Sequence, residues 1–311
     1  MHATSSAVFK NNSSSNNAHQ TFWGSSASPF PGEKMDRVAA WKRLNEKIKS
    51  LNGGYGLEGR RSYDKGLPAT WSASAMSEDV GLCPVSFGSI KPNWIETANG
   101  TNYEAIKKFV QSIPDDRIVY LVFHHEPEDN TKQKGYSTQL LQSAFAKFVD
   151  AVLDAGKPNV HPCFVLMSYT FRPQSGRNPD DFNMAAKLKP DQLDKVIAGV
   201  DGYAKTAETP ASEIFEPCLT KFASWGFKRF GIFETATKPE PSAAARVKWI
   251  QELGAWVNSR KDIELVSWFH SGVGPHAGPS GWFIGGRSNI NSDFTLTDDG
   301  SIAAYAQLVK H

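Results

Sequence analysis

The sequence is poor in cysteine, and this limits the kinds of site that it can build. Cys83, Cys163 and Cys218 are spread over 311 residues, and no two of them form a C-x-x-C pair. A zinc knuckle or a disulfide framework needs cysteines that are closely or regularly spaced. We therefore expect three buried free thiols, the usual state of isolated cysteines.

The sequence also lacks a long hydrophobic run, a charge excess and a phosphate-binding loop. No apolar stretch approaches the roughly 18–20 residues of a transmembrane helix. The 34 basic and 32 acidic residues leave a formal net charge of +2, which argues against nucleic acid or an anionic membrane as the main partner. No G-x-x-x-x-G-K-[ST] motif occurs, and the sequence indicates no cofactor and no metal ion.

Residues 1–20 differ in composition from the rest of the chain. They are rich in Ser and Asn and contain no 7–15-residue apolar segment of the kind found in secretory signals. We interpret them as a flexible arm that precedes a single folded domain over residues 21–311. Such an arm could attach the domain to a larger assembly, and the sequence leaves open whether the location is extracellular or virion-associated.

A regular alternation of strand and helix signals follows the arm. Apolar runs typical of parallel strands covered on both faces alternate with segments whose apolar residues have helical spacing. The predicted strands are residues 21–26, 56–64, 83–90, 117–126, 161–171, 196–203, 228–236 and 263–272. This order and length fit a single (β/α)8 TIM barrel. The alternative, an open doubly wound sheet, is less favoured because no Gly-rich loop follows the first strand.

Two of the predicted strands end in a glutamate. VYLVFHHEPEDN, residues 119–130, places Glu126 at the end of the fourth strand, and GIFETAT places Glu234 at the end of the seventh. Barrel active sites are built at the carboxyl ends of the strands, so the two carboxylates should face each other across the mouth. Glycoside hydrolysis uses such a pair. The structural alternative for either glutamate alone is a salt bridge to a nearby Arg or Lys.

The strand ends resemble those of a known group of enzymes. The pair His125-Glu126, the segment GIFETAT and the segment VDGY are similar to the fourth, seventh and sixth strands of glycoside hydrolase family 26, the β-mannanase family. Residues 20–310 therefore resemble that family or a divergent neighbour in the clan of retaining (β/α)8 glycosidases.

The resemblance implies a role for each matching residue. It implies a retaining, endo-β-glycanase-like enzyme that cleaves an oligo- or polysaccharide by double displacement, with Glu126 as general acid and then base and Glu234 as nucleophile. Tyr203 would donate a hydrogen bond to Glu234, and His125 would bind a sugar hydroxyl or the nucleophile. The carboxyl oxygens of a retaining pair lie about 5–5.5 Å apart, and a separation beyond roughly 12 Å would rule out the shared role.

Further residues near the strand ends are candidates for binding the sugar. Trp268 is the best candidate for a stacking platform, and Arg61 rather than Arg60 is expected to point inward. We interpret Glu128 and Asp129 as parts of a solvated acidic loop. The remaining candidate contacts are Lys91, Trp94, Tyr169, Arg172 and His270.

Two rival functions fit parts of the pattern. A non-catalytic glycan-binding or structural barrel, such as a module of a phage tail, would keep the aromatic residues but would need neither glutamate. A metal-dependent barrel hydrolase is less favoured because no H-x-H pair is present and because one of its histidines falls at the start of a strand. Its ligands would come from His124, His125, His161, His270 and His276.

Overall fold

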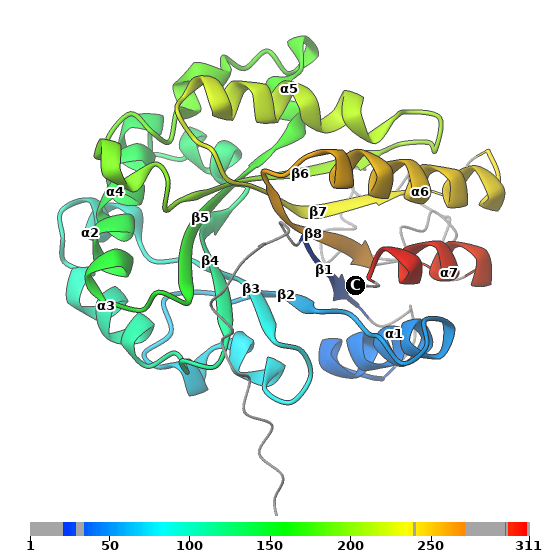
Figure 1. Cartoon of the computed structure of the whole chain (residues 1–311). Helices are drawn as coiled ribbons and strands as arrows, with labels where there is room; N and C mark the ends of the chain where they lie inside the picture. Colours follow the sequence, from blue (N-terminus) through cyan, green and yellow to red (C-terminus); the bar gives the residue numbers. More distant parts are fainter. Residues whose placement is uncertain (1–20, 29–33, 239–240, 271–295, 297, 310–311) are drawn as a thin grey trace, which may run out of the picture.

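The computed structural model describes residues 21–28, 34–238, 241–270, 296 and 298–309. Eight parallel strands close into a barrel in which each strand pairs with the next along the chain and β8 pairs with β1. The helices surround the barrel on its outside (Figure 1). The predicted (β/α)8 TIM barrel is thereby confirmed. The arm, residues 1–20, and His276 lie outside the described residues.

Each predicted strand is present, with bounds that differ from the expected ones by a few residues. The strands are β1 (Phe22–Ala27), β2 (Gly59–Tyr63), β3 (Val85–Ile90), β4 (Ile118–His125), β5 (Val160–Met167), β6 (Ile197–Ala204), β7 (Phe230–Thr237) and β8 (Ile263–His270). The helices are α1 (Arg37–Leu51), α2 (Trp94–Ala98), α3 (Tyr103–Gln111), α4 (Thr138–Asp154), α5 (Ala211–Ser224), α6 (Ala243–Ser259) and α7 (Asp299–Leu308).

Local sequence signals fix where several helices begin. Asp36, Ser137, Ser242 and Asp298 each cap a helix by accepting a hydrogen bond from a backbone N–H of its first turn. These side chains satisfy donors that the helix itself leaves free, and each such cap typically stabilises a helix by about 1 kcal/mol. The caps therefore place the βα connections that shape the mouth of the barrel.

The hydrophobic core has two parts because both faces of the sheet are covered. Inside the barrel lies a cluster that includes Phe87, Tyr120 and Phe233. A larger cluster fills the space between the sheet and the helices. The three cysteines are buried and free, as expected. None of the helices in the described part of the chain combines the length and hydrophobicity that crossing a membrane requires.

Irregular strand pairing occurs close to the carboxyl ends of three strands. The pairing register shifts between Val122 and His125 in β4, between Val200 and Asp201 in β6, and within β7 before Thr235. Such irregularities re-aim side chains and are common next to active sites. They decide which residues of these strands point into the mouth of the barrel.

Candidate active site

The end of β4 has an unusual backbone. His124 and Glu126 have φ values of 54° and 47°, and they are the only non-glycine residues of the described chain with positive φ. Such conformations cost an L residue of order 1 kcal/mol or more and cluster at functional sites. His124 turns outward, where its Nε2–H donates to the Pro92 carbonyl at 2.7 Å. The neighbouring His125 and Glu126 line the pocket at the mouth of the barrel.

Glu234 is buried at the other side of this pocket and is held by several donors. The hydroxyl groups of Tyr63 and Tyr203 donate hydrogen bonds to its two carboxyl oxygens. Nε of Arg61 lies 4.0 Å from Oε1. Burial, together with the charge of Asp201, raises the pKa of Tyr203, so its hydroxyl stays a donor. The structure therefore brings the predicted donor, Tyr203, to Glu234 and adds a second tyrosine.

His125 lies between the two glutamates. Its Nε2 atom is 3.9 Å from Oε2 of Glu126 and 3.5 Å from Oε1 of Glu234. Because both oxygens are measured from the same nitrogen, adding the two distances shows that they lie no more than about 7.4 Å apart. This limit is well inside the roughly 12 Å at which a shared catalytic role would be ruled out. It covers the spacing of a retaining pair and the lower end of the roughly 6.5–9.5 Å spacing of an inverting pair.

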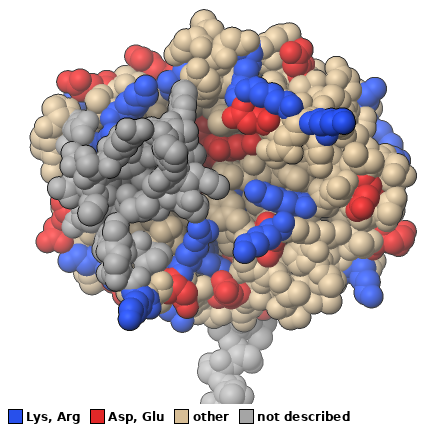
Figure 2. All heavy atoms as spheres, turned by 180° about the vertical axis from the view of Figure 1, so that it is seen from behind, with Lys and Arg blue, Asp and Glu red and all other residues tan. Residues whose placement is uncertain are grey.

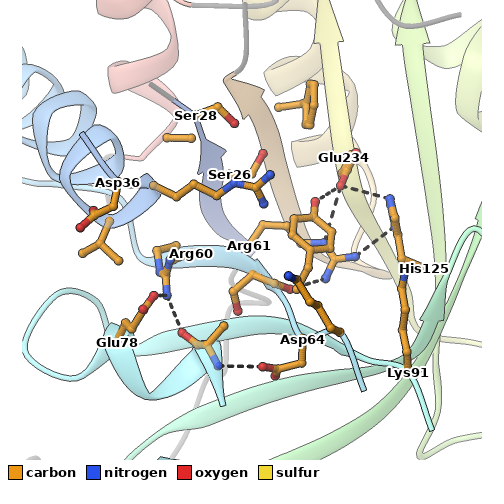
Figure 3. A pocket seen from close by; sticks show the side chains of 18 of the residues that line it. Ser26, Ser28, Asp36, Arg60, Arg61, Asp64, Glu78, Lys91, His125 and Glu234 are labelled. Carbon is orange, nitrogen blue, oxygen red and sulfur yellow. Dashed lines mark hydrogen bonds and ion pairs between the residues drawn. The ribbon is translucent and has the colours of Figure 1, made fainter. Parts of the chain in front are cut away.

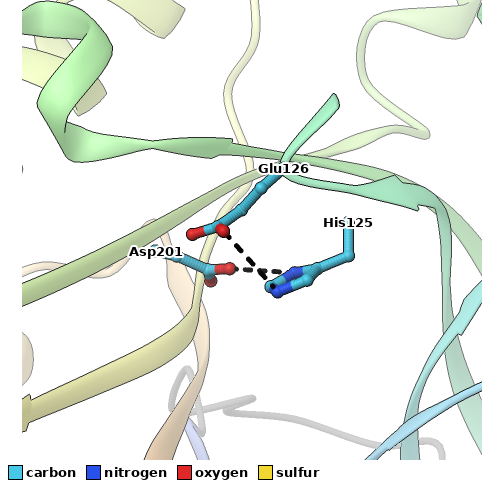
Figure 4. Close-up of side chains that lie close together, drawn as sticks. All are labelled: His125, Glu126 and Asp201. Atoms are coloured by element: carbon cyan, nitrogen blue, oxygen red, sulfur yellow. Dashed lines mark ion pairs between the residues drawn. The ribbon is translucent and has the colours of Figure 1, made fainter. Parts of the chain in front are cut away.

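Asp201 orients the other edge of the His125 ring. Its Oδ2 atom lies 3.1 Å from Nδ1 of His125, and Nη2 of Arg61 lies 3.3 Å from the same nitrogen. Figure 4 shows the carboxyl groups of Asp201 and Glu126 both facing the His125 ring, each paired with one ring nitrogen. Asp201 is the pairing partner of Glu234 in the β6–β7 register, so both side chains leave the sheet on the same face.

Burial raises the pKa of both glutamates to about 7. For Glu126 the positive charge of His125 opposes this rise, while the negative charges of Asp201 and Glu128 add to it. For Glu234 the charges of Arg61 and Arg37 oppose it. Hydrogen bonds donated to a carboxylate favour its ionised form, and the hydroxyl groups of Tyr63 and Tyr203 donate to Glu234. If one proton is shared, it therefore belongs on Glu126.

The two glutamates line a pocket of about 710 Å³ at the ends of β1 to β4. Its wall contains Arg61, Tyr63 and His125, and Phe269 closes it on the β8 side. Figure 3 shows Arg61 of β2, His125 of β4 and Glu234 of β7 pointing toward one another across this space. On the face opposite to that of Figure 1, Lys and Arg side chains border a hollow in the surface (Figure 2). The volume is in the range of pockets that hold small ligands.

The structure decides between Arg60 and Arg61 as predicted. Arg61 is buried inside the barrel, where its Nη1 donates to the Phe87 carbonyl at 3.1 Å. Arg60 turns outward and forms an ion pair with Asp79. Strand alternation places Tyr63 on the same face as Arg61, and Asp201 on the same face as Tyr203. Tyr63 and Asp201 are site residues that the sequence analysis does not single out, although this alternation identifies both.

The prediction that Trp268 is a sugar platform is wrong. Its side chain is 0% exposed and packs against Trp249 of α6 and Tyr305 of α7, in the core outside the barrel. Strand alternation then turns the next residue, Phe269, toward the pocket, where its ring meets that of Tyr203 edge to face at 5.7 Å. The phase of the alternation in β8 is therefore opposite to the one we expected.

Other predicted contacts also lie elsewhere. Tyr169 is not among the residues that line the pocket, and its hydroxyl donates to the Gln174 carbonyl within its own loop. Trp94 is fully buried in the core. His270 is buried, and its Nδ1 accepts the Leu296 N–H at 3.1 Å. Lys91, by contrast, lines the pocket.

Glu128 is not part of a solvated loop, contrary to our interpretation. It is 1% exposed, and its Oε1 accepts the Met167 N–H at 2.6 Å and the Thr170 hydroxyl at 2.9 Å. Burial raises its pKa to about 7. Glu128 thus ties the segment after β4 to the end of β5 and supports the backbone that carries Glu126. Asp129 is exposed, as expected.

The described histidines of the metal-dependent alternative do not meet at one place. Burial lowers the pKa of His124 and His161 to about 4 and that of His270 to about 3, and only His125 among the described histidines lines the pocket. His125, Glu126 and Asp201 do offer ligand atoms within 4.8 Å of one another. A cation held there would face the buried guanidinium of Arg61, which opposes its binding.

Asp201 gives a prediction for stability. Burial raises its pKa from 3.8 to about 8 in the folded protein, so between these values the folded state binds more protons than the unfolded state and stability falls as pH rises. Asp201→Asn removes this dependence. Relative to wild type, the free energy of unfolding of the variant should increase between pH 5 and pH 8 by ~2–4 kcal/mol, measured by denaturant titration.

The control is Asp116→Asn, because Asp116 is exposed at the turn before β4. Its free energy of unfolding should follow that of wild type at every pH. If Asp201→Asn also ran parallel to wild type across this range, the carboxyl of Asp201 would not be a buried group with a raised pKa.

Tyr203 gives a prediction for the pH dependence of activity. Its hydroxyl favours the ionised form of Glu234, so Tyr203→Phe should raise the pKa of that carboxyl by about one unit. On any glycoside that the protein hydrolyses, the acid limb of kcat/KM should then move to higher pH. Tyr55→Phe is the matched control because Tyr55 is exposed and is not among the residues that line the pocket. An acid limb that did not move would show that Tyr203 does not set the ionisation of Glu234.

Comparisons with known proteins agree with this fold. No protein-family profile matches the chain, and no curated protein sequence is significantly similar to it. Among solved structures, a subgroup II endo-β-1,3-glucanase of glycoside hydrolase family 128 from Sorangium cellulosum is similar, with 15% identity, a TM-score of 0.53 and coverage of 93% of this chain and 99% of that chain. A structure from a study of two fungal β-1,4-galactanases has 12% identity, a TM-score of 0.58 and coverage of 92% and 99%.

A further similar structure is an endo-β-1,4-glucanase from Xanthomonas axonopodis pv. citri, with 14% identity, a TM-score of 0.54 and coverage of 94% of this chain and 99% of that chain. At these identities the likeness establishes the shared (β/α)8 barrel fold. Membership of family 26 is not shown. The chain thus has the barrel fold of these glycoside hydrolases.

Proposed function

We propose that the protein is a retaining glycoside hydrolase that cleaves an oligo- or polysaccharide, with Glu126 as acid/base and Glu234 as nucleophile. The observation that carries the proposal is the pair of carboxyl groups from β4 and β7 on either side of His125 Nε2, at 3.9 and 3.5 Å. Both line one pocket at the carboxyl end of the barrel, where active sites of this fold are found.

The environments of the two carboxyls suit different roles. Glu234 receives two tyrosine hydroxyl donors and lies near Arg61, which favours a carboxylate that is aimed and ready to attack. Glu126 has acidic groups around it and burial that raises its pKa to about 7, which favours a proton donor near neutral pH. Because burial raises the pKa of both carboxyls to about 7, the two tyrosine donors at Glu234 are the difference that assigns the ionised form to Glu234 and the proton to Glu126.

The reaction then proceeds in two steps. Glu234 attacks the anomeric carbon while Glu126 gives its proton to the glycosidic oxygen, so the bond to the leaving sugar breaks and a glycosyl ester on Glu234 forms. Glu126, now ionised, takes a proton from water, and the water oxygen attacks the same carbon. The ester bond breaks, Glu234 is released as a carboxylate, and the product keeps its anomeric configuration.

The neighbouring residues support these steps by position. Arg61 places a positive charge near Glu234, and the two tyrosines donate hydrogen bonds to its carboxyl. His125 lies between the two glutamates, and Oδ2 of Asp201 contacts its Nδ1 at 3.1 Å. A non-catalytic barrel would need none of this arrangement. The structural neighbours named as an endo-β-1,3-glucanase, a β-1,4-galactanase and an endo-β-1,4-glucanase add support at the level of fold.

A glycan panel tests the proposal. The wild-type protein is incubated with mannans, β-glucans, xylans and bacterial surface polysaccharides, and new reducing ends are measured. Release from at least one β-linked glycan is the expected result. Glu234→Gln serves as the control because it removes the nucleophile with little change of shape. No release from any member, or equal release by the variant, would contradict the proposal.

A further inference from the structure

Three exposed cations border one side of the pocket. Arg37 is the first residue of α1, after β1; Lys65 follows β2; and Lys91 directly follows β3. The three residues therefore come from successive βα connections, which are neighbours at the mouth of a barrel. None of the three side chains has an ion pair or hydrogen-bond partner within the described residues.

The backbone holds two of these connections together. The Lys91 N–H donates to the Gly66 carbonyl at 3.0 Å, and the Asp64 N–H donates to the Ser89 carbonyl at 2.8 Å. Lys65 and Lys91 thus extend from two segments that are directly joined. Arg37 lines the same pocket as Glu234, and its positive charge opposes the rise that burial causes in the pKa of Glu234.

The acidic side chains of the same wall are already occupied. Glu78 pairs with Arg60 at 3.0 Å. Asp64 accepts the Ser74 hydroxyl at 2.6 Å and the Ala75 N–H at 2.9 Å, and Asp36 caps α1. Figure 3 shows Asp36, Asp64 and Glu78 around the same pocket. Glu78 is thus paired with a cation, whereas Asp36 and Asp64 keep their charge and accept hydrogen bonds from neutral donors. The three unpaired cations of the wall therefore exceed its two remaining carboxylates by one.

Lysines elsewhere on the surface are of both kinds: some are paired with an acidic side chain, and others, such as Lys107 and Lys108 of α3, have no ion pair among the described residues. Lys132 pairs with Asp129 at 2.7 Å, Lys189 with Asp150 at 2.9 Å, and Lys221 with Asp180 at 2.7 Å. Unpaired cations that gather on one wall of a concave site draw anions to it, because the walls of a cleft concentrate the field of the charges. Arg37, Lys65 and Lys91 line the same pocket as the two glutamates, so a sugar chain bound at the glutamates would lie within the electrostatic field of the three cations.

We propose that the pocket binds a glycan that carries an anionic substituent, with the negative group held by Arg37, Lys65 and Lys91. This inference rests on the proposed function, because it assumes that the sugar chain lies in the pocket beside Glu126 and Glu234. Carboxylate and sulfate are both suitable, because each accepts charge-assisted hydrogen bonds from lysine and arginine. The substrate class is thus an acidic polysaccharide rather than a neutral one.

Binding to catalytically disabled protein tests this without turnover. Glu234→Gln is titrated by calorimetry with a cellouronate oligosaccharide, with a cello-oligosaccharide of equal length and with its sulfated form. The charged ligands should bind about tenfold or more tightly than the neutral one at low ionic strength, and the difference should shrink at high salt because the charges are screened. Preference for the uronate or for the sulfate identifies the anionic group.

Single substitutions locate the binding group. In the Glu234→Gln background, Lys65→Ala, Lys91→Ala and Arg37→Ala should each weaken binding of the preferred charged ligand by about fivefold, and binding of the neutral one by much less. Lys108→Ala is the matched control, since Lys108 is exposed on α3 and outside the pocket lining; it should leave both affinities unchanged. Circular dichroism establishes that each variant is folded.

The outcomes separate the two proposals. Equal binding of charged and neutral ligands, or equal effects of the pocket variants on both, would overturn the anionic site, and hydrolysis of a neutral glycan would still support the enzyme. Selective binding of a charged ligand that is lost in the lysine variants would support the anionic site even if the wild-type protein hydrolysed no glycan, a result that would overturn only the proposed function.

Discussion

Glu234→Gln is expected to lower the hydrolysis of every glycoside substrate by on the order of 10⁴-fold or more, because no covalent glycosyl intermediate can form without the nucleophile. The loss should occur with every leaving group, since attack at the anomeric carbon and departure of the leaving group take place in one step and no leaving group replaces the nucleophile. Glutamine keeps the shape of the side chain among its tyrosine partners, so a folding defect is not expected. The measurement is the initial rate on a natural glycan and on an activated aryl glycoside.

Azide provides a further readout for this position. With Glu234→Ala, azide should enter the space left by the carboxylate and give a glycosyl azide of inverted configuration. A Glu234 variant that retained near wild-type rates would show that another group attacks the sugar, and the two tyrosines at Glu234 would then need a structural explanation.

Glu126→Ala should give a loss that depends on the leaving group. On a natural glycan the rate should fall by about 10²–10⁴-fold, the usual contribution of a general acid. On an aryl glycoside with an activated leaving group, the first step needs no proton and should survive. Added azide should then speed the second step, because it replaces water that the lost carboxylate would have activated, and the glycosyl azide should keep the original configuration.

Glu208→Ala is a suitable control, since Glu208 lies in the β6–α5 connection outside the pocket lining and its replacement should change neither rate. Equal losses for Glu126→Ala on activated and natural substrates would contradict the assignment of Glu126 as the acid. Glu126 would then be a residue that positions the other groups of the site and does not donate the proton.

The fold could be predicted because the signals for it are local. Apolar strand segments, helical spacing and capping residues recur along the chain, and each strand ends at the same edge of a parallel barrel. This also brought Glu126, Glu234 and Tyr203 to one place, since strand ends meet whatever the details of packing. The segment VYLVFHHEPEDN therefore carries titratable residues because it leaves the buried sheet at the candidate active site.

The direction of individual side chains could not be predicted in the same way. Both faces of a barrel strand are buried, so hydrophobicity does not tell which set of alternating residues points inward. For β8 this reversed the roles of Trp268 and Phe269. Near the end of β4 the register shift and the positive φ values of His124 and Glu126 interrupt the alternation, and tertiary packing rather than local sequence determines such irregularities.

Glu128 shows a second limit of sequence patterns. The run Glu126-Pro-Glu128-Asp129 reads as an exposed acidic turn, yet Glu128 is buried because the end of β5 supplies a backbone N–H and a threonine hydroxyl to its carboxyl. These donors lie 39 and 42 residues away along the chain. Burial of a polar group through distant partners leaves no local signal.

The most direct test of the central claim is proton NMR of the first product formed from the glycan that gives the most new reducing ends. If Glu126 and Glu234 act as acid/base and nucleophile, a β-linked glycan should first yield the β-anomer, and the α-anomer should appear later through mutarotation. The signal of the α-anomer appearing first, from wild-type protein, would contradict double displacement through Glu234.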